Sequence, residues 1–595
     1  MHRISQIIIK NFRACKEVHL PLGSFTPLVG PNNTGKSTIL EAIRWALKSS
    51  ALSESDFHKS GEAVVVAACV EGITADLLEK IPEEKHRKAI EPYCKDGKLW
   101  IRRVATGTSA KAMSSEIWDI DKCADHEQPD VWRDYPTGLP QAVSVLLPEP
   151  VFIEAMEDIG EDLGKAKAGS TIKQLLDEIM APIVAAHEDL NKALDTIRHI
   201  LTADGNKRST HLKDFDQQAT DALTHFFPGL ALDLDLQVVD VKEFFKAGDL
   251  HVTDKATGDR RRFDQMGTGA QRSIQMALIR YLSETRNAKN TGPSRRLLLI
   301  DEPELYLHPQ GVRRLRQALG TLSNAGFQVV FSTHSPLMLS RENAADTVIV
   351  NKFPDDGVKT QLPLRHAVST AFADAESQSR TLFELGNLAE IYFSDRVVLC
   401  EGKTDRRLLP LAYQQLYGHP PELDHIAFVS LGSCADLRKA MPVLASMGIE
   451  YRVVADLDFA FTHARTGGTP LLAKDGADLQ EAKALLAILQ AEHGYTLGGN
   501  GLPENARKTG WSAADAWAVM ARHDKGKAIV QKTNEDLRRQ GVFVWSCGCI
   551  EDVTGHTDKG EEAIAAQEEK LRKMMASDIA KGMPLLKECC EWLRA

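Results

Sequence analysis

The sequence lacks long apolar runs, zinc-type cysteine pairs and an excess of basic residues. No apolar stretch approaches the roughly 18 residues that a membrane-spanning helix needs, so we expect no membrane contact. The ten cysteines include no CxxC pair, which argues against structural zinc and favours a reduced, cytoplasmic setting. The first residues, Met1 to Phe12, alternate between polar and apolar and predict a strand rather than an export signal.

The chain is acidic overall and ordinary in composition. Its 72 Lys+Arg stand against 82 Asp+Glu, which gives a net charge of −10. This balance excludes a protein that coats nucleic acid by bulk positive charge, but it leaves room for local contacts with phosphates. With 595 residues, 43% of them hydrophobic, the chain should hold two to four globular domains at roughly 150 residues each.

A phosphate-binding loop is the clearest motif. An apolar strand ending at Val29 leads into GPNNTGKST, and a helical run follows, which is the strand–loop–helix context that GxxxxGK[ST] requires. Its backbone N–H groups would surround phosphate oxygens, Lys36 would reach the β- and γ-phosphates, and Ser37 would bind Mg²⁺. The predicted ATP contacts in this loop are Gly30, Asn32, Asn33, Gly35, Lys36, Ser37 and Thr38.

An acidic partner for the loop follows much later in the chain. The run RRLLLIDEP predicts a buried strand that ends in two carboxylates, Asp301 for the magnesium shell and Glu302 to orient or deprotonate the attacking water. Asp301 lies 265 residues after Lys36 (301 − 36), more than a compact NTPase domain needs. We therefore expect an insertion between the two halves.

Two further segments complete an ABC-type set. Residues 266–273, MGTGAQRS, are similar to an ABC signature, which predicts ATP contacts from Gly267, Gly269 and Gln271; Thr268 and Ala270 depart from the usual LSGGQ form. The strand-like run VVFSTHSP places His334 at the switch-histidine position. In ABC-type ATPases the signature of one subunit faces the γ-phosphate held by the other, so this set implies a homodimer or higher homo-oligomer.

The middle of the chain is predicted to form an insertion in the ATPase domain. Residues 160–227 show helical spacing of apolar positions, too short for a long coiled coil. A helical dimerisation insert is the favoured interpretation, and an elaboration of the ATPase core is the alternative. The predicted domains are therefore 1–159 and 228–385 for the two ATPase parts, 160–227 for the insert, and 386–595 for a second α/β domain.

In this last domain, carboxylates follow strand-like runs. Runs 395–400, 426–430, 451–455 and 541–546 alternate with helices, which predicts a parallel sheet with ligands at its carboxyl edge. The predicted metal ligands at or near the strand ends are Glu401, Asp405, Asp456, Asp458 and Glu551. With no His or Cys in register, these hard oxygen ligands suit two Mg²⁺ or Mn²⁺ ions, with Ca²⁺ as an alternative, which would clamp the attacking water and the leaving oxygen of a phosphodiester.

These motifs resemble known families. The opening strand and P-loop resemble the structural-maintenance and recombination ATPases, and DEPELYLHPQ narrows this to their AAA15/AAA21-like branch. Glu401-Gly402 and Asp456-Leu457-Asp458 resemble the acidic motifs of a Toprim domain. An ABC-type ATPase followed by Toprim is the architecture of the OLD (overcoming lysogenization defect) nucleases. Asp405 and the long segment after DxD are similar to their class 2 (Gabija-type) members, some of which are encoded beside a UvrD-like helicase in anti-phage defence.

The resemblance implies a fold and an activity. The expected fold is α/β: an ABC-type P-loop ATPase with a helical insert, then a Toprim (Rossmann-like parallel sheet) domain. The expected activity is metal-dependent DNA cleavage regulated by ATP, with Glu401, Asp456 and Asp458 as catalytic acids. The resemblance also implies a C-terminal catalytic lysine, for which Lys559 is our choice and Lys581 the alternative.

Two other functions stay open at this point. One is an ATP-driven DNA-organising or recombination protein whose Toprim-like half binds metal without cutting. The other is a topoisomerase- or primase-like enzyme, although no tyrosine after Glu401 lies in an evident active-site motif.

Overall fold

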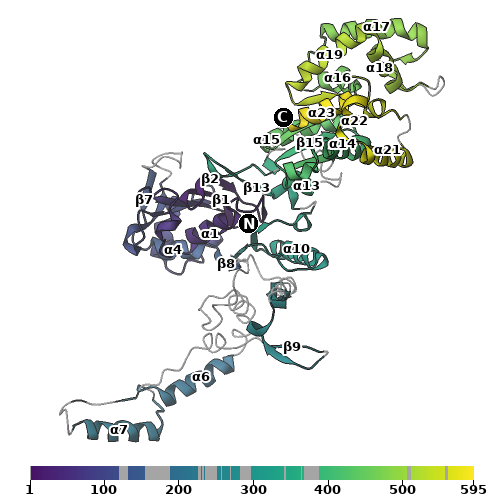
Figure 1. Cartoon of the computed structure of the whole chain (residues 1–595). Coiled ribbons are helices and arrows are strands. Elements are labelled where there is room, and N and C mark those ends of the chain that lie inside the picture. The colour runs from purple at the N-terminus through teal and green to yellow at the C-terminus, as the bar shows by residue number, and fades with distance from the viewer. Residues whose placement is uncertain are drawn as a thin grey trace. The chain divides into compact units, whose positions relative to one another are not determined.

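The computed structural model describes most of the chain (Figure 1). The described residues are 2–119, 131–153, 188–204, 206–224, 230, 233–234, 251–255, 257–267, 270–271, 273–275, 277–279, 281, 296–340, 343–363, 365–366, 388–467, 469–505, 511–556 and 560–595. They fall into two compact units: 1–16, 22–26 and 37–338 form the first, and 17–21, 27–36 and 339–595 form the second. No described helix is both long and apolar enough to cross a bilayer.

The first unit contains an antiparallel sheet built from the N-terminal strand onward. Its strands, in spatial order, are β1 (Arg3–Phe12), β4 (Val64–Glu71), β5 (Lys98–Ala105), β6 (Met113–Trp118) and β7 (Trp132–Asp134). Its short helices are α2 (Ala75–Leu78), α3 (Glu84–Ile90) and α4 (Leu139–Leu146). The strand predicted for the N-terminus is confirmed, and Ile4, Ile7 and Ile9 are buried in it.

Parallel strands of the same unit carry the acidic pair. β11 (Arg296–Ile300) lies between β8 (Glu149–Ile153) and β12 (Gln328–Thr333), parallel to both. The apolar run of β11 is buried, as a parallel strand covered on both faces requires. The helix α10 (Pro309–Asn324) packs against it through Val312, Leu315 and Leu319.

Two helices and a hairpin lie in the predicted insert and just after it. α6 (Glu188–Leu201) and α7 (Thr210–Thr224) confirm helical structure there, while residues 154–187 lie outside the described part. Buried Arg208 joins the pair, with its guanidinium 2.6 Å from Asp216 and bonded to the carbonyl of Leu201. After the insert, β9 (His251–Thr253) and β10 (Arg260–Arg262) pair antiparallel.

The second unit begins with the strand that leads into the phosphate-binding loop. Leu28 and Val29, the end of β3 (Phe25–Val29), pair parallel with β13 (Val348–Phe353), which pairs antiparallel with β14 (Gly357–Thr360). The strand β2 (Cys15–Pro21) precedes β3, and the helix α1 (Lys36–Leu47) follows the loop.

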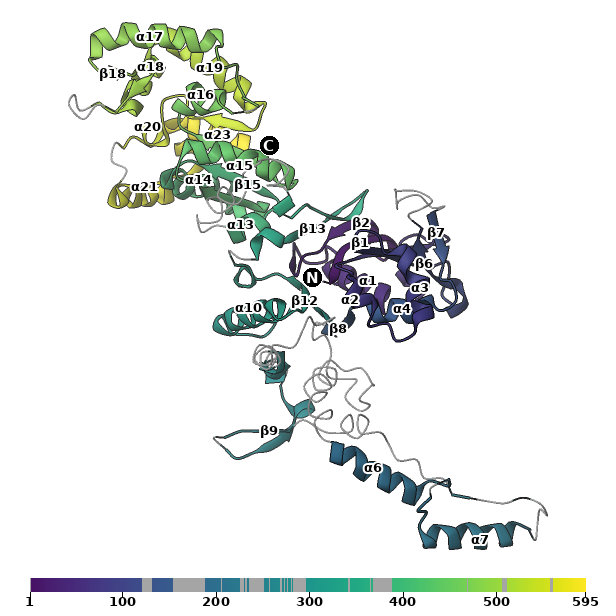
Figure 2. The same ribbon diagram turned by 180° about the vertical axis from the view of Figure 1, so that it is seen from behind.

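The C-terminal domain is a four-stranded parallel sheet, as predicted. Its order is β16 (Ile426–Ser430), β15 (Arg396–Cys400), β17 (Glu450–Ala455) and β20 (Val542–Val544), and each adjacent pair is parallel. The helices α14 (Lys403–Tyr417) and α15 (Cys434–Ser446) lie close to β15 in Figure 2 and pack on opposite faces of it. The remaining helices are α13 (Leu388–Tyr392), α16 (Asp458–Phe461), α17 (Ala477–His493), α18 (Ala513–Arg522), α19 (Asp524–Arg538), α20 (Ile550–Thr554), α21 (Glu561–Lys573), α22 (Ala576–Gly582) and α23 (Pro584–Arg594), and β18 (Thr496–Leu497) pairs with β19 (Pro503–Glu504).

Alternate residues of β15 divide the core of this domain into two layers. Val397 and Leu399 face an apolar cluster formed by α15 to α19, whereas Val398 and Cys400 face a second cluster formed by α14 and α20 to α23. This period-two alternation is what a strand produces when helices cover both faces of its sheet. Both faces are therefore filled, and the carboxyl edge is the place left for a site.

Candidate active site

The phosphate-binding loop has the backbone that its glycines predict. Gly35 has φ +98°, and a Cβ there would lie 2.6 Å from Val358 Cγ2. The Lys36 amine is buried and donates to the carbonyls of Gly30 (3.0 Å) and Pro31 (2.7 Å). Of the other predicted contacts, Asn32 and Asn33 are exposed and Thr38 is half-buried in α1.

The predicted magnesium pair meets in the structure. Ser37 Oγ, at the start of α1, donates a 3.0 Å hydrogen bond to Asp301 Oδ1, directly after β11. Asp301 also accepts a short hydrogen bond from Ser332 Oγ at the end of β12. Parallel pairing of β11 with β12 brings these ends together, and the serine hydroxyl and aspartate fit an Mg²⁺ that bridges nucleotide phosphates.

Glu302 and His334 are also adjacent, with 3.1 Å between Glu302 Oε1 and His334 Nε2. Glu302 has φ +43°, a left-handed backbone that is strained for a residue with a side chain, and its N–H donates to Ser332 Oγ at 2.9 Å. Glu304 fixes the histidine loop: its Oε1 accepts from Thr333 Oγ1 (2.6 Å) and from the His334 N–H (2.8 Å). Burial raises the pKa of Glu304.

The signature segment is described only in part. Gly267 and Gln271 are described, while Gly269 lies outside the described residues. The buried Gln271 amide donates to the carbonyls of Met266 (2.8 Å) and Phe263 (3.1 Å), so it braces its own loop. Its predicted contact with ATP stays a prediction.

The acidic cluster of the C-terminal domain converges at the carboxyl edge of the parallel sheet. Glu401 follows β15, Asp456 follows β17, and Asp458 opens α16. The Asp456 N–H donates to Glu401 Oε2 at 3.3 Å. Adjacent parallel strands place these side chains together, as the sequence analysis expects.

Two further acids lie buried next to this edge. The Trp545 indole donates to Asp405 Oδ1 at 2.8 Å, and the Thr404 hydroxyl donates to Glu551 Oε1 at 2.8 Å. Burial raises the pKa of Asp405 to about 7, with the nearby Glu551 and Glu401 charges adding to the increase and the Trp545 hydrogen bond opposing it. A buried carboxyl group next to other acids is the kind of group that a divalent cation stabilises in its charged form.

The structure adds a cysteine to the predicted oxygen ligands, although the sequence analysis expected no Cys in register. Cys434 Sγ lies 2.9 Å from Glu401 Oε2 and 3.9 Å from Asp458 Oδ1, and one ligand atom from each of these three residues lies within 4.8 Å of the others. The cysteine opens α15, four residues after β16 ends, so its approach depends on a turn that strand spacing does not reveal. The sequence analysis also missed Thr404, Ser332 and Trp545, since hydrogen-bond donors to buried acids carry no motif.

The proposed catalytic lysine lies outside the described residues, which stop at His556 and resume at Gly560. The flanking elements are both tied to the acidic site. α20 carries Glu551, and α21 lies beside α14 in Figures 1 and 2, where Arg407 makes two hydrogen bonds with Glu568 (2.6 and 2.7 Å). Lys581, the alternative, is exposed in the last turn of α22.

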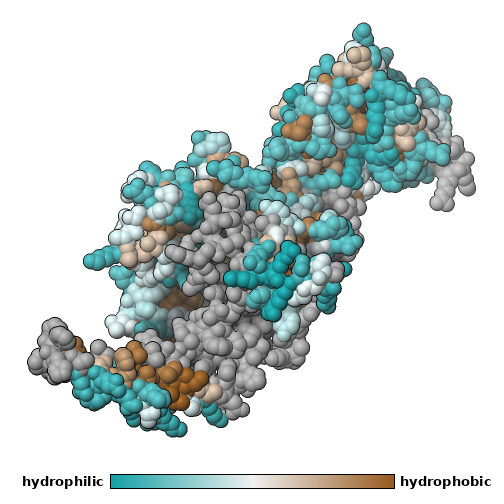
Figure 3. Space-filling model, turned by 60° about the horizontal axis from the view of Figure 1, so that its bottom comes forward, coloured by the Kyte–Doolittle hydropathy of each residue, from teal (hydrophilic) through white to brown (hydrophobic). Residues whose placement is uncertain are grey.

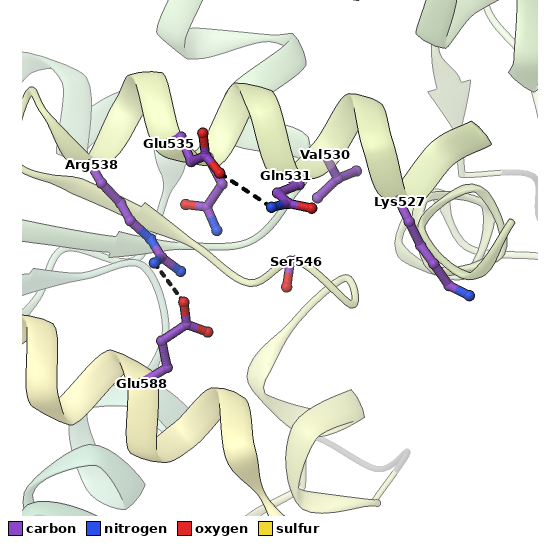
Figure 4. A pocket seen from close by; sticks show the side chains of 8 residues that line it. Lys527, Val530, Gln531, Glu535, Arg538, Ser546 and Glu588 are labelled. Carbon is purple, nitrogen blue, oxygen red and sulfur yellow. Dashed lines mark hydrogen bonds and ion pairs between the residues drawn. The ribbon is translucent and has the colours of Figure 1, made fainter. Parts of the chain in front are cut away.

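A cavity of about 320 Å³ lies elsewhere in the same domain (Figure 4). Its lining comes from α19, α23 and the residues after β20, and its polar groups are partly paired with one another, Arg538 with Glu588 at 2.6 Å and Gln531 with Glu535 at 3.2 Å. None of the residues predicted from the sequence as site residues lines it. The acidic edge is therefore the better candidate site.

Comparison with known proteins agrees with this geometry. The AAA ATPase domain family matches residues 3–96 and 148–339, and the "overcoming lysogenization defect protein-like, TOPRIM domain" family matches 392–458. The Old nuclease of Escherichia phage P2 is 32% identical over 564 residues, which cover 94% of this chain and 94% of that protein. The chain belongs to the OLD nuclease family.

Two more relatives match over shorter spans. The OLD nuclease of Thermus scotoductus is 23% identical over 76% of this chain and 82% of its own length, and endonuclease GajA of Bacillus cereus is 22% identical over 68% and 67%. This OLD family member is thus a nuclease with an AAA ATPase domain, as the sequence analysis predicts. The matched ranges do not fix the domain boundaries, which stay predictions.

Proposed function

We propose that this OLD family protein is an ATP-regulated, divalent-metal-dependent DNA endonuclease. The observation that carries the proposal is the convergence of Glu401, Asp456 and Asp458 at one sheet edge, with Asp405 and Glu551 buried beside them. Such a cluster binds cations that bridge to phosphate oxygens, so the acidic chain contacts DNA without a large basic surface.

The donor set fits hard divalent cations. Glu401 and Asp456 directly follow strands of the sheet, and Asp458 opens α16. Asp405 is held by the Trp545 indole and Glu551 by the Thr404 hydroxyl, so these carboxylates are oriented before any ion binds. We propose two ions per site, Mg²⁺ or Mn²⁺ with Ca²⁺ as a third option, held by Glu401, Asp405, Asp456, Asp458 and Glu551. Ions there would polarise the scissile phosphate and lower the pKa of the attacking water.

We propose Lys559 as the residue that stabilises negative charge on the phosphate during cleavage. Its segment connects α20, which carries Glu551, with α21, which Arg407 holds against the helix of Asp405. Lys581, the alternative, is exposed in the last turn of α22.

ATP is proposed to regulate cleavage rather than drive each cut. Lys36, Ser37 and Asp301 would bind the phosphates and their Mg²⁺. Glu302 and His334, which lie next to each other, would take part in ATP hydrolysis. Val29, the residue before Gly30, belongs to the same apolar cluster as Leu399 and Leu437 of the C-terminal domain. This continuity supports transmission from the phosphate-binding loop to the nuclease sheet.

We also propose that the protein works as a homodimer or larger homo-oligomer. The ABC-type arrangement needs a second signature segment, and the helices α6 and α7 expose apolar side chains such as Ile197 (43%) and Phe215 (48%). Figure 3 shows brown, hydrophobic surface among the teal residues of this part of the molecule. The proposal also includes four points carried over from the sequence analysis: membership in class 2, a UvrD-like helicase partner, a cytoplasmic setting and a role in anti-phage defence. The nine described cysteines are all free thiols, which is consistent with a reducing compartment.

A plasmid assay tests the proposed function. The full chain is incubated with supercoiled and linear DNA, with Mg²⁺ or Mn²⁺, with and without ATP, and the products are examined for protein–DNA adducts. Nicks or breaks without religation or adducts support an endonuclease. DNA binding without cleavage under every metal would favour the DNA-organising alternative, and covalent adducts would favour a topoisomerase.

A further inference from the structure

Cys434 stands inside the acidic cluster, and the backbone holds it there. The turn after β16 is bonded to the end of the strand that carries Glu401: the Leu431 N–H donates to the Cys400 carbonyl (3.1 Å) and the Gly432 N–H to the Glu401 carbonyl (3.0 Å). Gly432 has φ +81°, a conformation that favours glycine. Ser433 then caps α15 by accepting from the Asp436 N–H at 3.2 Å. The position of the thiol is thus fixed by several local bonds.

The thiol is placed as a ligand would be. Its sulfur lies 2.9 Å from Glu401 Oε2 and 3.9 Å from Asp458 Oδ1, and only 6% of the Cys434 surface is exposed. The three residues lie beyond the ends of three different strands, β15, β16 and β17, and one ligand atom from each lies within 4.8 Å of the others.

We propose that Cys434 sets the metal selectivity of the nuclease site, so that a thiophilic divalent cation such as Cd²⁺ or Zn²⁺ binds Glu401, Cys434 and Asp458 and displaces Mg²⁺. This inference rests on the proposed function, because it assigns a role at the same site. Thiolate and carboxylate ligands together suit Zn²⁺ and softer cations, whereas Mg²⁺ prefers oxygen ligands alone. On binding, the cation forms a bond to sulfur and the thiol proton passes to solvent. The consequence is an enzyme that Mg²⁺ supports and traces of thiophilic metal inhibit.

Cadmium titration of the metal-free full chain tests this directly, through the ultraviolet thiolate-to-cadmium charge-transfer band. The band should appear in the wild type and saturate at one Cd²⁺ per site, and Cys434→Ser should remove it. Cys434→Ala serves as a second variant, and Cys94→Ser, which changes a half-buried thiol of the other compact unit, is the matched control that should keep the band.

Competition adds a quantitative readout. The affinity for Cd²⁺ should fall about 10- to 100-fold in Cys434→Ser, while the affinity for Mn²⁺, followed by its paramagnetic resonance signal, should change less than about threefold. In a cleavage assay with Mg²⁺, Cd²⁺ should inhibit the wild type and Cys94→Ser but not Cys434→Ser.

The results that would overturn the proposal differ from those that would overturn the proposed function. A wild type without the band, or a Cys434→Ser protein that keeps both the band and inhibition by Cd²⁺, would overturn the proposal and leave the thiol as a hydrogen-bond donor to Glu401. Failure of the proposed function looks different: the wild type would not cut DNA, while the band and its loss in Cys434→Ser would still be seen.

Discussion

His334 Nε2 lies 3.1 Å from the carboxylate of Glu302, and Glu304 holds the backbone N–H of His334 at 2.8 Å. The strained backbone of Glu302 and the fixed histidine loop together aim both side chains at one place. This is the arrangement expected of a carboxylate that orients a water and a histidine that contacts the γ-phosphate.

Glu302→Gln should therefore slow ATP turnover while ATP still binds. Loss of a positioned general base costs typically about 100-fold or more in rate. Steady-state phosphate release measures turnover, and a fluorescent ATP analogue measures binding. ATP turnover equal to that of the wild type would show that Glu302 is not the catalytic carboxylate of ATP hydrolysis.

Lys36→Ala should weaken nucleotide binding about 10- to 100-fold, the size expected when charge-assisted hydrogen bonds to phosphate are lost. Lys48→Ala is a suitable control, because Lys48 is an exposed lysine just after α1 and is not among the residues predicted to contact phosphate. Equal ATP affinity in Lys36→Ala and Lys48→Ala would mean that the phosphate-binding loop has been misread.

The two candidate lysines can be separated by a matched pair of variants. Lys559→Ala should reduce the rate of DNA cleavage about 100-fold with little change in ATP turnover, since it removes a charge that stabilises the transition state. Lys581→Ala should cleave at nearly the wild-type rate. The opposite result would transfer the role to the exposed lysine of α22.

The raised pKa of Asp405 predicts a pH dependence of metal binding. The folded protein keeps a proton on this buried carboxyl up to about pH 7, whereas the unfolded chain releases it near its ordinary pKa of about 4. The metal-free protein therefore loses stability as pH rises between these values. A cation must displace that proton, so a fixed concentration of Mg²⁺ should raise Tm more at pH 8 than at pH 6.

Thermal unfolding of the wild type and of Asp405→Asn checks this. The variant has no proton to displace at residue 405, so its smaller Mg²⁺-induced shift should be nearly the same at both pH values. An equal shift in the wild type at pH 6 and pH 8 would contradict a role for Asp405 in metal binding.

Much of the fold followed from local patterns. The apolar runs before Glu401 and Asp456 form buried parallel strands, as predicted, and the loop around Lys36 leads into a helix, as predicted. These elements could be predicted because they depend on short-range periodicity and on the residues of a single turn. The pairing of Ser37 with Asp301 was also predictable, because both belong to a known functional set.

What the sequence did not reveal depends on contacts between distant segments. Cys434 reaches Glu401 through the pairing of β15 with β16 and the cap of α15, and Trp545 reaches Asp405 across 140 residues. Neither carries a motif, and a cysteine four residues beyond a strand has no register with a carboxylate on another strand. Such contacts need the tertiary structure.

The most direct test of the nuclease assignment is plasmid cleavage by Asp456→Asn in Mg²⁺ or Mn²⁺, with ATP present and absent. Asp524→Asn is the control, because the Asp524 side chain is 98% exposed in the same domain. We predict that the wild type and Asp524→Asn cut the plasmid, and that Asp456→Asn cuts at least about 100-fold more slowly because a charge at the reacting phosphate is lost. Cleavage by Asp456→Asn at the wild-type rate would contradict the assignment.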